Sequence, residues 1–239
     1  MKNVIEVHDL TKQYQNRIVV DHLSFEVKQG EVYGILGHNG AGKTTTIECI
    51  LGLHRPEKGN ATIFGKNACQ HRKQLFERIG VQLQSSSYQN NIKVQEVCEE
   101  TAALYKRPQD YRALLDQFHL SSYDNQFVEK LSGGERQKLS IVIALIPDPQ
   151  VLFLDELTTG LDVEARREVW ETLKTLKQQG MTMILTTHYM EEAQYLCDRV
   201  LLLAHGKMVK EGTVDTIIQD SGKPNLEEAY LYYMKEESK

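Results

Sequence analysis

Apolar and polar residues alternate over the first 30 positions of the chain, in the pattern of short antiparallel strands joined by turns. Residues 32–36 then form a compact apolar run that ends in a glycine-rich turn. A helix-like stretch follows over residues 43–51, with Gly52 as its stop signal. Another short strand is predicted near residues 61–64. The chain is thus predicted to begin with an antiparallel β subdomain and to continue with a strand, a loop and a helix.

The segment from about residue 84 to residue 130 loses strand character and becomes richer in helix formers. We interpret it as an inserted helical subdomain over about residues 85–135. Its apolar contacts are expected to come from Val97, Ala102, Leu104, Leu114, Leu115 and Phe118.

Strand patterns return at residues 151–154 and 181–185, and a helix is predicted between them over residues 164–179. The apolar residues that share one face of this helix are Val169, Leu173 and Leu176. Residues 200–209 predict a hairpin, and two short helices are expected in a C-terminal extension over about residues 213–239. Because strands that alternate with helices imply a parallel sheet, the predicted fold class is α/β with a mostly parallel sheet, in a single domain over residues 1–239.

Length, charge and composition exclude several classes of protein. A chain of 239 residues fits one large domain, or a body with a smaller insert. Its 33 acidic residues outnumber its 28 basic residues, and this net charge of −5 argues against nucleic-acid binding through a basic surface. The longest apolar runs, residues 141–146 and 200–204, are far shorter than the roughly 20 residues of a membrane-spanning helix. The chain also lacks an apolar secretion signal and a CxxC pair, so we expect a cytoplasmic protein without a zinc site or disulfides.

Residues 37–44 fit the pattern GxxxxGK(S/T), and they lie between a predicted strand and a predicted helix, as this motif requires. Glycines let the backbone wrap closely around phosphates, and the amides at the helix N-terminus add positive potential. Lys43 can neutralise charge on the β and γ phosphates, and the Thr44 hydroxyl can bind the Mg2+ that bridges them. The candidate phosphate-binding residues are Gly37, His38, Asn39, Gly40, Ala41, Gly42, Lys43, Thr44 and Thr45. The loop predicts a P-loop NTPase core that binds ATP or GTP.

Two carboxylates, Asp155 and Glu156, directly follow the apolar run of residues 151–154. This order places them at the carboxyl edge of a buried strand, where open parallel sheets bind their ligands. Asp155 is suited to magnesium binding, and Glu156 is suited to position and polarise the water that attacks the γ phosphate. An isolated pair of acids is more often a solvated loop, but the phosphate loop favours the catalytic interpretation.

Residues 131–135, Leu-Ser-Gly-Gly-Glu, complete a set of motifs. The set runs along the chain as an aromatic residue near the start, the phosphate loop, a glutamine, LSGGE, VLFLDE, TTGLD and a histidine after a strand. With this set, nearly the whole chain resembles the ATP-binding subunit of an ABC transporter. A serine and two glycines that open a helix also form a second anion-binding N-terminus, and a serine-capped helix without a ligand is the alternative.

The resemblance implies an ATPase in which two such domains pack head to tail. Ser132, Gly133 and Gly134 of one subunit would then contact the γ phosphate that Lys43 of the other subunit holds. Asp162, in the sequence TTGLD, would help to hold the site of the opposite subunit, and it also fits a helix N-cap. The pair could be two copies of this chain, or this chain with a close homologue.

The same resemblance assigns three further residues to the nucleotide site. Tyr14 matches an aromatic residue that stacks on adenine, although an ordinary strand aromatic fits its spacing equally well. Gln84 matches the glutamine that touches Mg2+ and the attacking water; Gln82 is the alternative, but the junction with the helical subdomain favours Gln84. His188 follows the apolar residues 181–185 and matches the catalytic switch histidine.

Leu157 and Val163 depart from the family pattern, which more often has proline at both positions. These changes could loosen the dimer-contact loop, but they remove no catalytic group. Hydrolysis of ATP is therefore expected.

The resemblance also implies separate multi-span permease subunits, which we expect to dock between Ser85 and Arg112. Residues 187–200 are similar to exporter-type ATPases of the drug and antibiotic-resistance group. We therefore expect an export ATPase that uses ATP and Mg2+ at the cytoplasmic face of the membrane. The alternatives are an importer ATPase, a soluble ABC-type ATPase acting on ribosomes or DNA, and an unrelated nucleotide kinase. One domain without a heptad run disfavours the ribosome and DNA types, so no nucleic-acid partner is expected.

Overall fold

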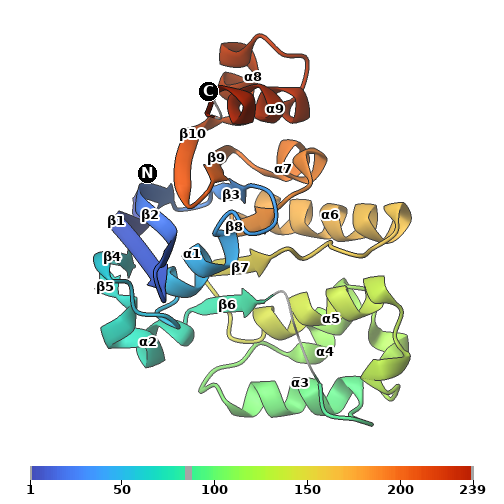
Figure 1. The fold of residues 1–239 in the computed structure, drawn as a ribbon. Helices are drawn as coiled ribbons and strands as arrows, with labels where there is room; N and C mark the ends of the chain where they lie inside the picture. The colour runs from blue at the N-terminus through green and yellow to red at the C-terminus, as the bar shows by residue number, and fades with distance from the viewer. Residues whose placement is uncertain (1, 84–87, 238–239) are drawn as a thin grey trace.

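The computed structural model describes residues 2–83 and 88–237, and two sheets form its centre (Figure 1). In the described part of the chain, the larger sheet has six strands in the order β10-β9-β3-β8-β7-β6. These strands are β3 (Val32–Leu36), β6 (Ile79–Gln82), β7 (Val151–Asp155), β8 (Thr182–Thr187), β9 (Arg199–Ala204) and β10 (Lys207–Thr213). All run parallel except β10, which pairs antiparallel with β9 and forms the predicted hairpin. The predicted α/β class and mostly parallel sheet are confirmed.

The smaller sheet is antiparallel, with its strands in the order β2-β1-β4-β5. They are β1 (Asn3–Tyr14), β2 (Arg17–Lys28), β4 (Lys58–Ile63) and β5 (Lys66–Asn67). The prediction of short strands at the N-terminus is wrong, because β1 and β2 each run over 12 residues. Their pairing shifts register at several points, for example between Val7 and Leu10. Such bulges interrupt the apolar alternation and bend a strand without ending it, so the sequence pattern resembles several short pieces.

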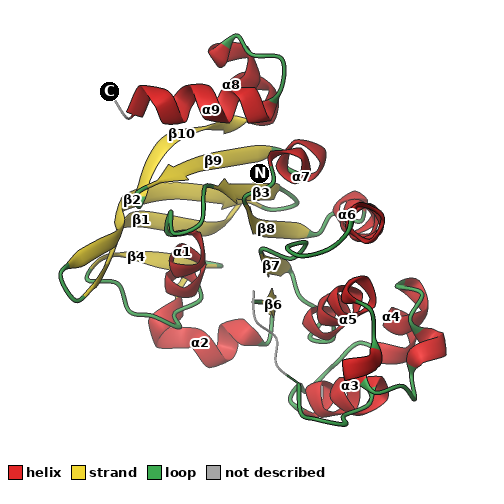
Figure 2. Cartoon of the chain, turned by 45° about the vertical axis from the view of Figure 1, so that its right-hand side comes forward, coloured by secondary structure: helices red, strands yellow, loops and turns green. Residues whose placement is uncertain are grey.

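A hydrophobic core lies on each side of the six-stranded sheet. Alternate residues of β7 enter different cores: Phe153 packs with α1 (Lys43–Ile50) and the smaller sheet, whereas Leu152 and Leu154 pack with the helices on the other side. Every residue of β3 and β7 is buried, as expected for central strands that are covered on both faces. Figure 2 shows α1 between the two sheets. This layering brings the carboxyl ends of the neighbouring strands β3, β8 and β7 to one edge.

The helical subdomain lies between β6 and β7, at the lower right of Figure 1. Its described elements are α3 (Val94–Ala103), α4 (Tyr111–Gln117) and the 3-10 turns Ser121–Tyr123 and Val128–Lys130, and α5 (Gly133–Leu145) leads back to the sheet. Among the predicted apolar contacts, those that are buried or half-buried are Val97, Ala102, Leu114, Leu115 and Phe118. The prediction for Leu104 is wrong: its side chain is 80% exposed, because it lies at the C-cap of α3, beyond the last packed turn.

The remaining helices are α2 (Ala68–Phe76), α6 (Val163–Gln178), α7 (Met190–Leu196), α8 (Val214–Ser221) and α9 (Leu226–Glu237). The helix predicted over residues 164–179 is confirmed by α6, whose apolar face is buried as expected. The sequence does not predict α2, because Ala68 and Leu75 are its buried residues and no apolar stripe results. The two expected closing helices, α8 and α9, pack beside β10 (Figure 1). No helix in residues 2–83 or 88–237 is long and apolar enough to cross a membrane.

Candidate active site

The phosphate loop connects the end of β3 to the start of α1, and its backbone carbonyl groups contact the Lys43 side chain. The ammonium of Lys43 donates hydrogen bonds to the carbonyl oxygens of Gly37 (2.9 Å) and His38 (3.1 Å). Gly42 has a φ of 107°, and a Cβ atom there would lie 2.5 Å from the carbonyl oxygen of Val19. A side chain at Gly42 is therefore excluded by both conformation and space, which explains the glycine in the motif.

The loop encloses a cavity of about 350 Å3. Its lining is Val19, Asn39, Gly40, Gly42, Lys43, Thr44, Thr45 and Glu156. The structure thus brings most of the predicted phosphate-binding residues together with one of the two predicted carboxylates. Val19 on β2 was not expected there, because no local motif marks it and only the packing of β2 against the loop places it.

Glu156 forms an ion pair with the lysine of this loop. Its Oε1 lies 2.9 Å from Lys43 Nζ, and both side chains are almost fully buried. Its Oε2 lies 3.6 Å from Nδ1 of His188, which follows the end of β8. Glu156 has a φ of 48°, and its amide donates to the backbone oxygen and the hydroxyl of Thr186 (3.1 Å each). The backbone of Glu156 is therefore held in the left-handed region, with its carboxylate between Lys43 and His188. A carboxylate fixed in this way is suited to orient a water.

Asp155 is fully buried at the end of β7 and is paired in register with Thr186 of β8. It accepts a hydrogen bond from the Thr186 hydroxyl through Oδ1. Burial raises the pKa of the Asp155 carboxyl above its usual value, and the hydroxyls of Thr186 and Thr44 offset this in part. No hydrogen bond of normal geometry from the described residues reaches Asp155 Oδ2. A buried carboxylate oxygen that lacks such a bond, near a threonine hydroxyl, fits a hard divalent cation such as Mg2+.

The residues of LSGGE form a separate site at the start of α5. Ser132 and Glu135 cap this helix reciprocally: the Ser132 amide donates to Glu135 Oε2 (2.8 Å), and the Glu135 amide donates to Ser132 Oγ (3.3 Å). A hollow of about 360 Å3 is lined by Ser132, Gly134 and Asp162 among others, and it shares no lining residue with the cavity of the phosphate loop. Asp162 accepts a hydrogen bond from the Ala165 amide (2.9 Å), so it is the N-cap of α6.

The other predicted site residues are not among the residues that line the loop cavity, or they lie outside the described residues. Tyr14 ends β1, is 39% exposed and lies beside His54. It does not itself line the cavity, but its side chain interacts with Thr45, which does. Gln84 lies outside the described residues. Gln82, the alternative, is buried at the end of β6 and donates to the Leu83 carbonyl oxygen (2.7 Å). Gly133 opens α5 with the LSGGE residues, and Ala41 is buried within the loop.

Comparisons with known proteins place the chain in a family. The family model described as ABC transporter matches residues 20–159. The chain is 40% identical to the Nod factor export ATP-binding protein I of Sinorhizobium fredii, over 90% of this chain and 64% of that protein. It is 33% identical to the "Probable multidrug ABC transporter ATP-binding protein YbhF" of Escherichia coli, over 96% of this chain and 41% of that protein. The chain therefore spans less than two thirds of the length of either relative.

A solved structure of an ATP binding subunit of an ABC transporter superposes with a TM-score of 0.86 at 28% identity, covering 97% of this chain and 99% of that chain. The matched residues 20–159 are more than half of the chain, and they contain the phosphate loop, LSGGE and the two carboxylates. The chain belongs to the ABC transporter family and is one of its ATP-binding subunits, an ATPase.

Proposed function

We propose that this chain hydrolyses MgATP as a dimer and thereby drives export through separate membrane subunits. The observation that carries the proposal is the meeting of Lys43, Asp155, Glu156 and His188 at the carboxyl ends of three adjacent parallel strands. This constellation supplies a cation for phosphate, a carboxylate for a metal, and a base with a nearby imidazole for the attacking water.

Each residue has a role that follows from its place. Lys43 and the loop amides bind the β and γ phosphates, and ATP then replaces Glu156 as the partner of Lys43. Thr44 and Asp155 would hold Mg2+, which supplies positive charge for the phosphates when it is bound. Glu156, released from Lys43, orients and polarises the attacking water, and His188 contacts the γ phosphate. Gln84 and Tyr14 keep their proposed roles at the metal and the adenine.

The dimer completes the site. Because LSGGE and Asp162 line a hollow separate from the loop cavity, one chain carries two incomplete halves of a nucleotide site. Ser132, Gly133 and Gly134 of a second ATP-binding subunit are proposed to contact the γ phosphate bound by the first. ATP then joins the subunits, and loss of the γ phosphate releases them, which is a switch that membrane partners can follow.

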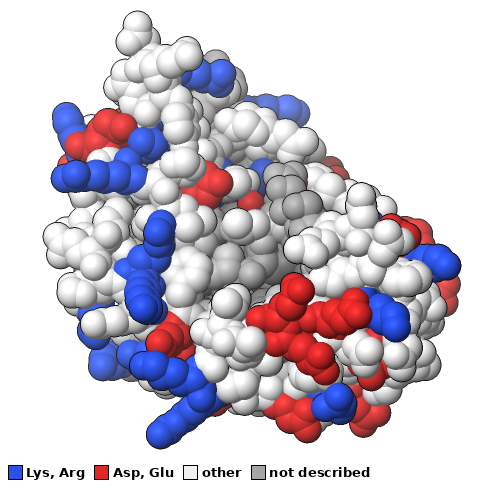
Figure 3. All heavy atoms as spheres, turned by 90° about the horizontal axis from the view of Figure 1, so that it is seen from below, with Lys and Arg blue, Asp and Glu red and all other residues white. Residues whose placement is uncertain are grey.

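The direction of transport and the partners are inferred from the relatives. One relative is named for Nod factor export and the other as a probable multidrug ABC transporter ATP-binding protein, so the two names differ in the transported molecules. The first name and the similarity of residues 187–200 to exporter-type ATPases favour export. We infer that multi-span permease subunits dock near residues 85–112 and hold the chain at the cytoplasmic face of the membrane. A nucleic-acid partner is not expected. On the face in Figure 3, a cluster of acidic side chains lies with lysines and arginines beside it, and the net charge of the chain is −5.

The test uses Glu156→Gln, which is expected to bind ATP and to hydrolyse it slowly, as bait in detergent-solubilised membranes of the source cells. Magnesium and ATP are present, and Lys43→Met, which cannot bind the phosphates, is the control bait. Recovery of a multi-span membrane protein with Glu156→Gln alone supports the proposal. Recovery of ribosomes or DNA-associated proteins without a membrane protein contradicts it and favours a soluble ATPase.

A further inference from the structure

A buried carboxylate outside the nucleotide cavity joins three elements of the site. The Glu192 side chain, on α7, is 3% exposed. Its Oε1 accepts one hydrogen bond from Thr158 Oγ1 (2.8 Å) and another from Trp170 Nε1 (2.9 Å). Thr158 belongs to the loop between Glu156 and Asp162, and Trp170 belongs to α6. A charged acceptor is costly to bury, so this carboxylate must stay paired with its two donors.

A second contact from α6 ties the same two segments together. The Arg166 guanidinium lies 4.1 Å from the ring centroid of Tyr189, the residue that follows His188. It also donates to the carbonyl oxygen of Leu161, the residue before Asp162 (3.4 Å). The loop of residues 157–162 and the segment after β8 are therefore each held to α6, and Glu192 joins them directly.

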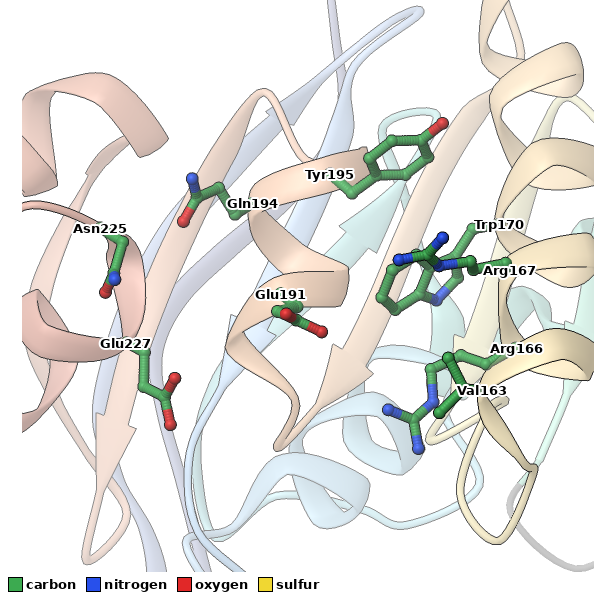
Figure 4. A pocket seen from close by; sticks show the side chains of 9 residues that line it. All are labelled: Val163, Arg166, Arg167, Trp170, Glu191, Gln194, Tyr195, Asn225 and Glu227. Carbon is green, nitrogen blue, oxygen red and sulfur yellow. The ribbon is translucent and has the colours of Figure 1, made fainter.

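Two of these side chains, Arg166 and Trp170, line a pocket of about 460 Å3, which Figure 4 shows. Arg166 and Trp170 project from α6 toward α7, and Trp170 stacks on Tyr195 of α7 with ring centroids 5.6 Å apart. Glu191 precedes Glu192 on α7, is exposed and lines the pocket. The two neighbouring glutamates thus occupy opposite environments, one in solvent and one in the contact between the loop and the helices.

We propose that Glu192 is a positioning residue for ATP hydrolysis, which keeps the loop of residues 157–162 in register with the segment that carries His188. Glu156 and Asp162 lie just before and at the end of that loop, so the bond to Thr158 makes Glu156, Asp162 and His188 move as one unit. The inference rests on the proposed function, because it assumes that Glu156 and His188 act on ATP and that Asp162 meets a second subunit.

The test measures steady-state ATP hydrolysis by Glu192→Leu, Glu192→Gln and Glu191→Leu beside the wild-type chain. Glu192→Leu leaves the Thr158 hydroxyl and the Trp170 indole N–H without an acceptor, so kcat is expected to fall about tenfold or more. The KM for ATP should change less than about twofold, because the loop that binds the phosphates is not part of the contact. Glu192→Gln keeps an acceptor oxygen at the same place and should retain kcat within about threefold of the wild-type value.

Glu191→Leu is the matched control, because it makes the same substitution in the same first turn of α7. It should leave kcat and KM as in the wild-type chain. Thr158→Val removes one donor with little change of shape, and it decides the question if Glu192→Leu does not fold. In the double variant Thr158→Val with Glu192→Leu, the loss of kcat should be smaller than the product of the two single losses, because both remove the same bond.

Several results would overturn the inference. Unchanged kcat in both Thr158→Val and Glu192→Leu would do so, and so would a rise in KM without a fall in kcat. Failure of Glu192→Gln to restore activity would assign the role to the charge, and would refute positioning through these two hydrogen bonds. A wild-type chain that does not hydrolyse ATP would instead overturn the proposed function, and the inference with it.

Discussion

The buried ion pair between Lys43 and Glu156 should compete with nucleotide for the lysine. Lys43 Nζ contacts Glu156 Oε1 at 2.9 Å and two carbonyl oxygens of the phosphate loop. A phosphate group that binds the Lys43 ammonium must displace the Glu156 carboxylate from it. We therefore expect Glu156→Gln to bind ADP, and ATP without magnesium, more tightly than the wild-type chain does.

The magnitude follows from the geometry. Two unit charges about 4 Å apart attract by about 4 kcal/mol at an effective dielectric constant of about 20, and desolvation of both groups offsets much of this. Glutamine keeps an acceptor oxygen, so the variant loses only the difference between a charge-assisted and a neutral hydrogen bond, about 1–1.5 kcal/mol. The Kd for ADP should therefore fall roughly five- to tenfold, and the free energy of unfolding of the ligand-free variant should fall by about the same 1–1.5 kcal/mol.

Isothermal titration with ADP and with ATP in EDTA measures both affinities without hydrolysis. Urea unfolding without nucleotide measures the contribution of the Lys43–Glu156 pair to the free energy of unfolding. Asp220→Asn is the control, since Asp220 pairs with Lys210 (2.7 Å) away from both the loop cavity and the LSGGE hollow and should leave nucleotide affinity unchanged. Equal or weaker binding of ADP by Glu156→Gln, together with unchanged stability, would show that Lys43 is not restrained by Glu156 and would refute the reasoning.

Three further predictions test the proposed metal ligand Asp155, the phosphate loop and the thiols. Burial raises the pKa of Asp155, so its ionised form costs stability at neutral pH. Asp155→Asn should raise Tm at pH 7 while hydrolysis of ATP with magnesium is lost, and the gain in Tm should shrink toward acid pH, where Asp155 is protonated. A lower Tm at pH 7 would contradict this. Gly42→Ala should lower the free energy of unfolding by more than about 1 kcal/mol and abolish nucleotide binding. Gly40→Ala, whose Cβ would meet nothing within 4 Å, should lower the free energy of unfolding by less, as measured in urea. At pH 8 a maleimide should label the exposed Cys69 rapidly and the other three thiols slowly. Those three are buried, and burial raises the pKa of Cys49 to about 12. Fast labelling of two or more thiols in the folded chain would refute this.

The sequence predicts the parts of the site that are local, and it misses those that depend on register between distant segments. The phosphate loop is recognisable because one strand, one turn and one helix supply all of it within residues 32–51. The contact between Asp155 and Thr186 cannot be recognised in the sequence, because it requires β7 and β8 to pair parallel with these two residues in register. The prediction for Leu104 is wrong for a related reason. Its apolar side chain suggests a core position, but Leu104 lies at the end of α3, where no other described element packs over it.

The same distinction explains why the loop of residues 157–162 is held without the prolines that the family more often has. Val163 is the first residue of α6, directly after the N-cap Asp162, and it is 68% exposed. At such a position proline presets φ but adds no contact, and its missing N–H would have had no partner within the helix. In this chain the Asp162 cap and the Glu192 bond to Thr158 fix the two ends of the loop through side chains instead. A loop held by hydrogen bonds to α7 can shift together with α7, whereas a loop stiffened by proline keeps its shape when its neighbours move. The loop of residues 157–162 is thus coupled through the Thr158–Glu192 bond to the segment that carries His188, and the proposed contact with a second subunit would depend on that segment.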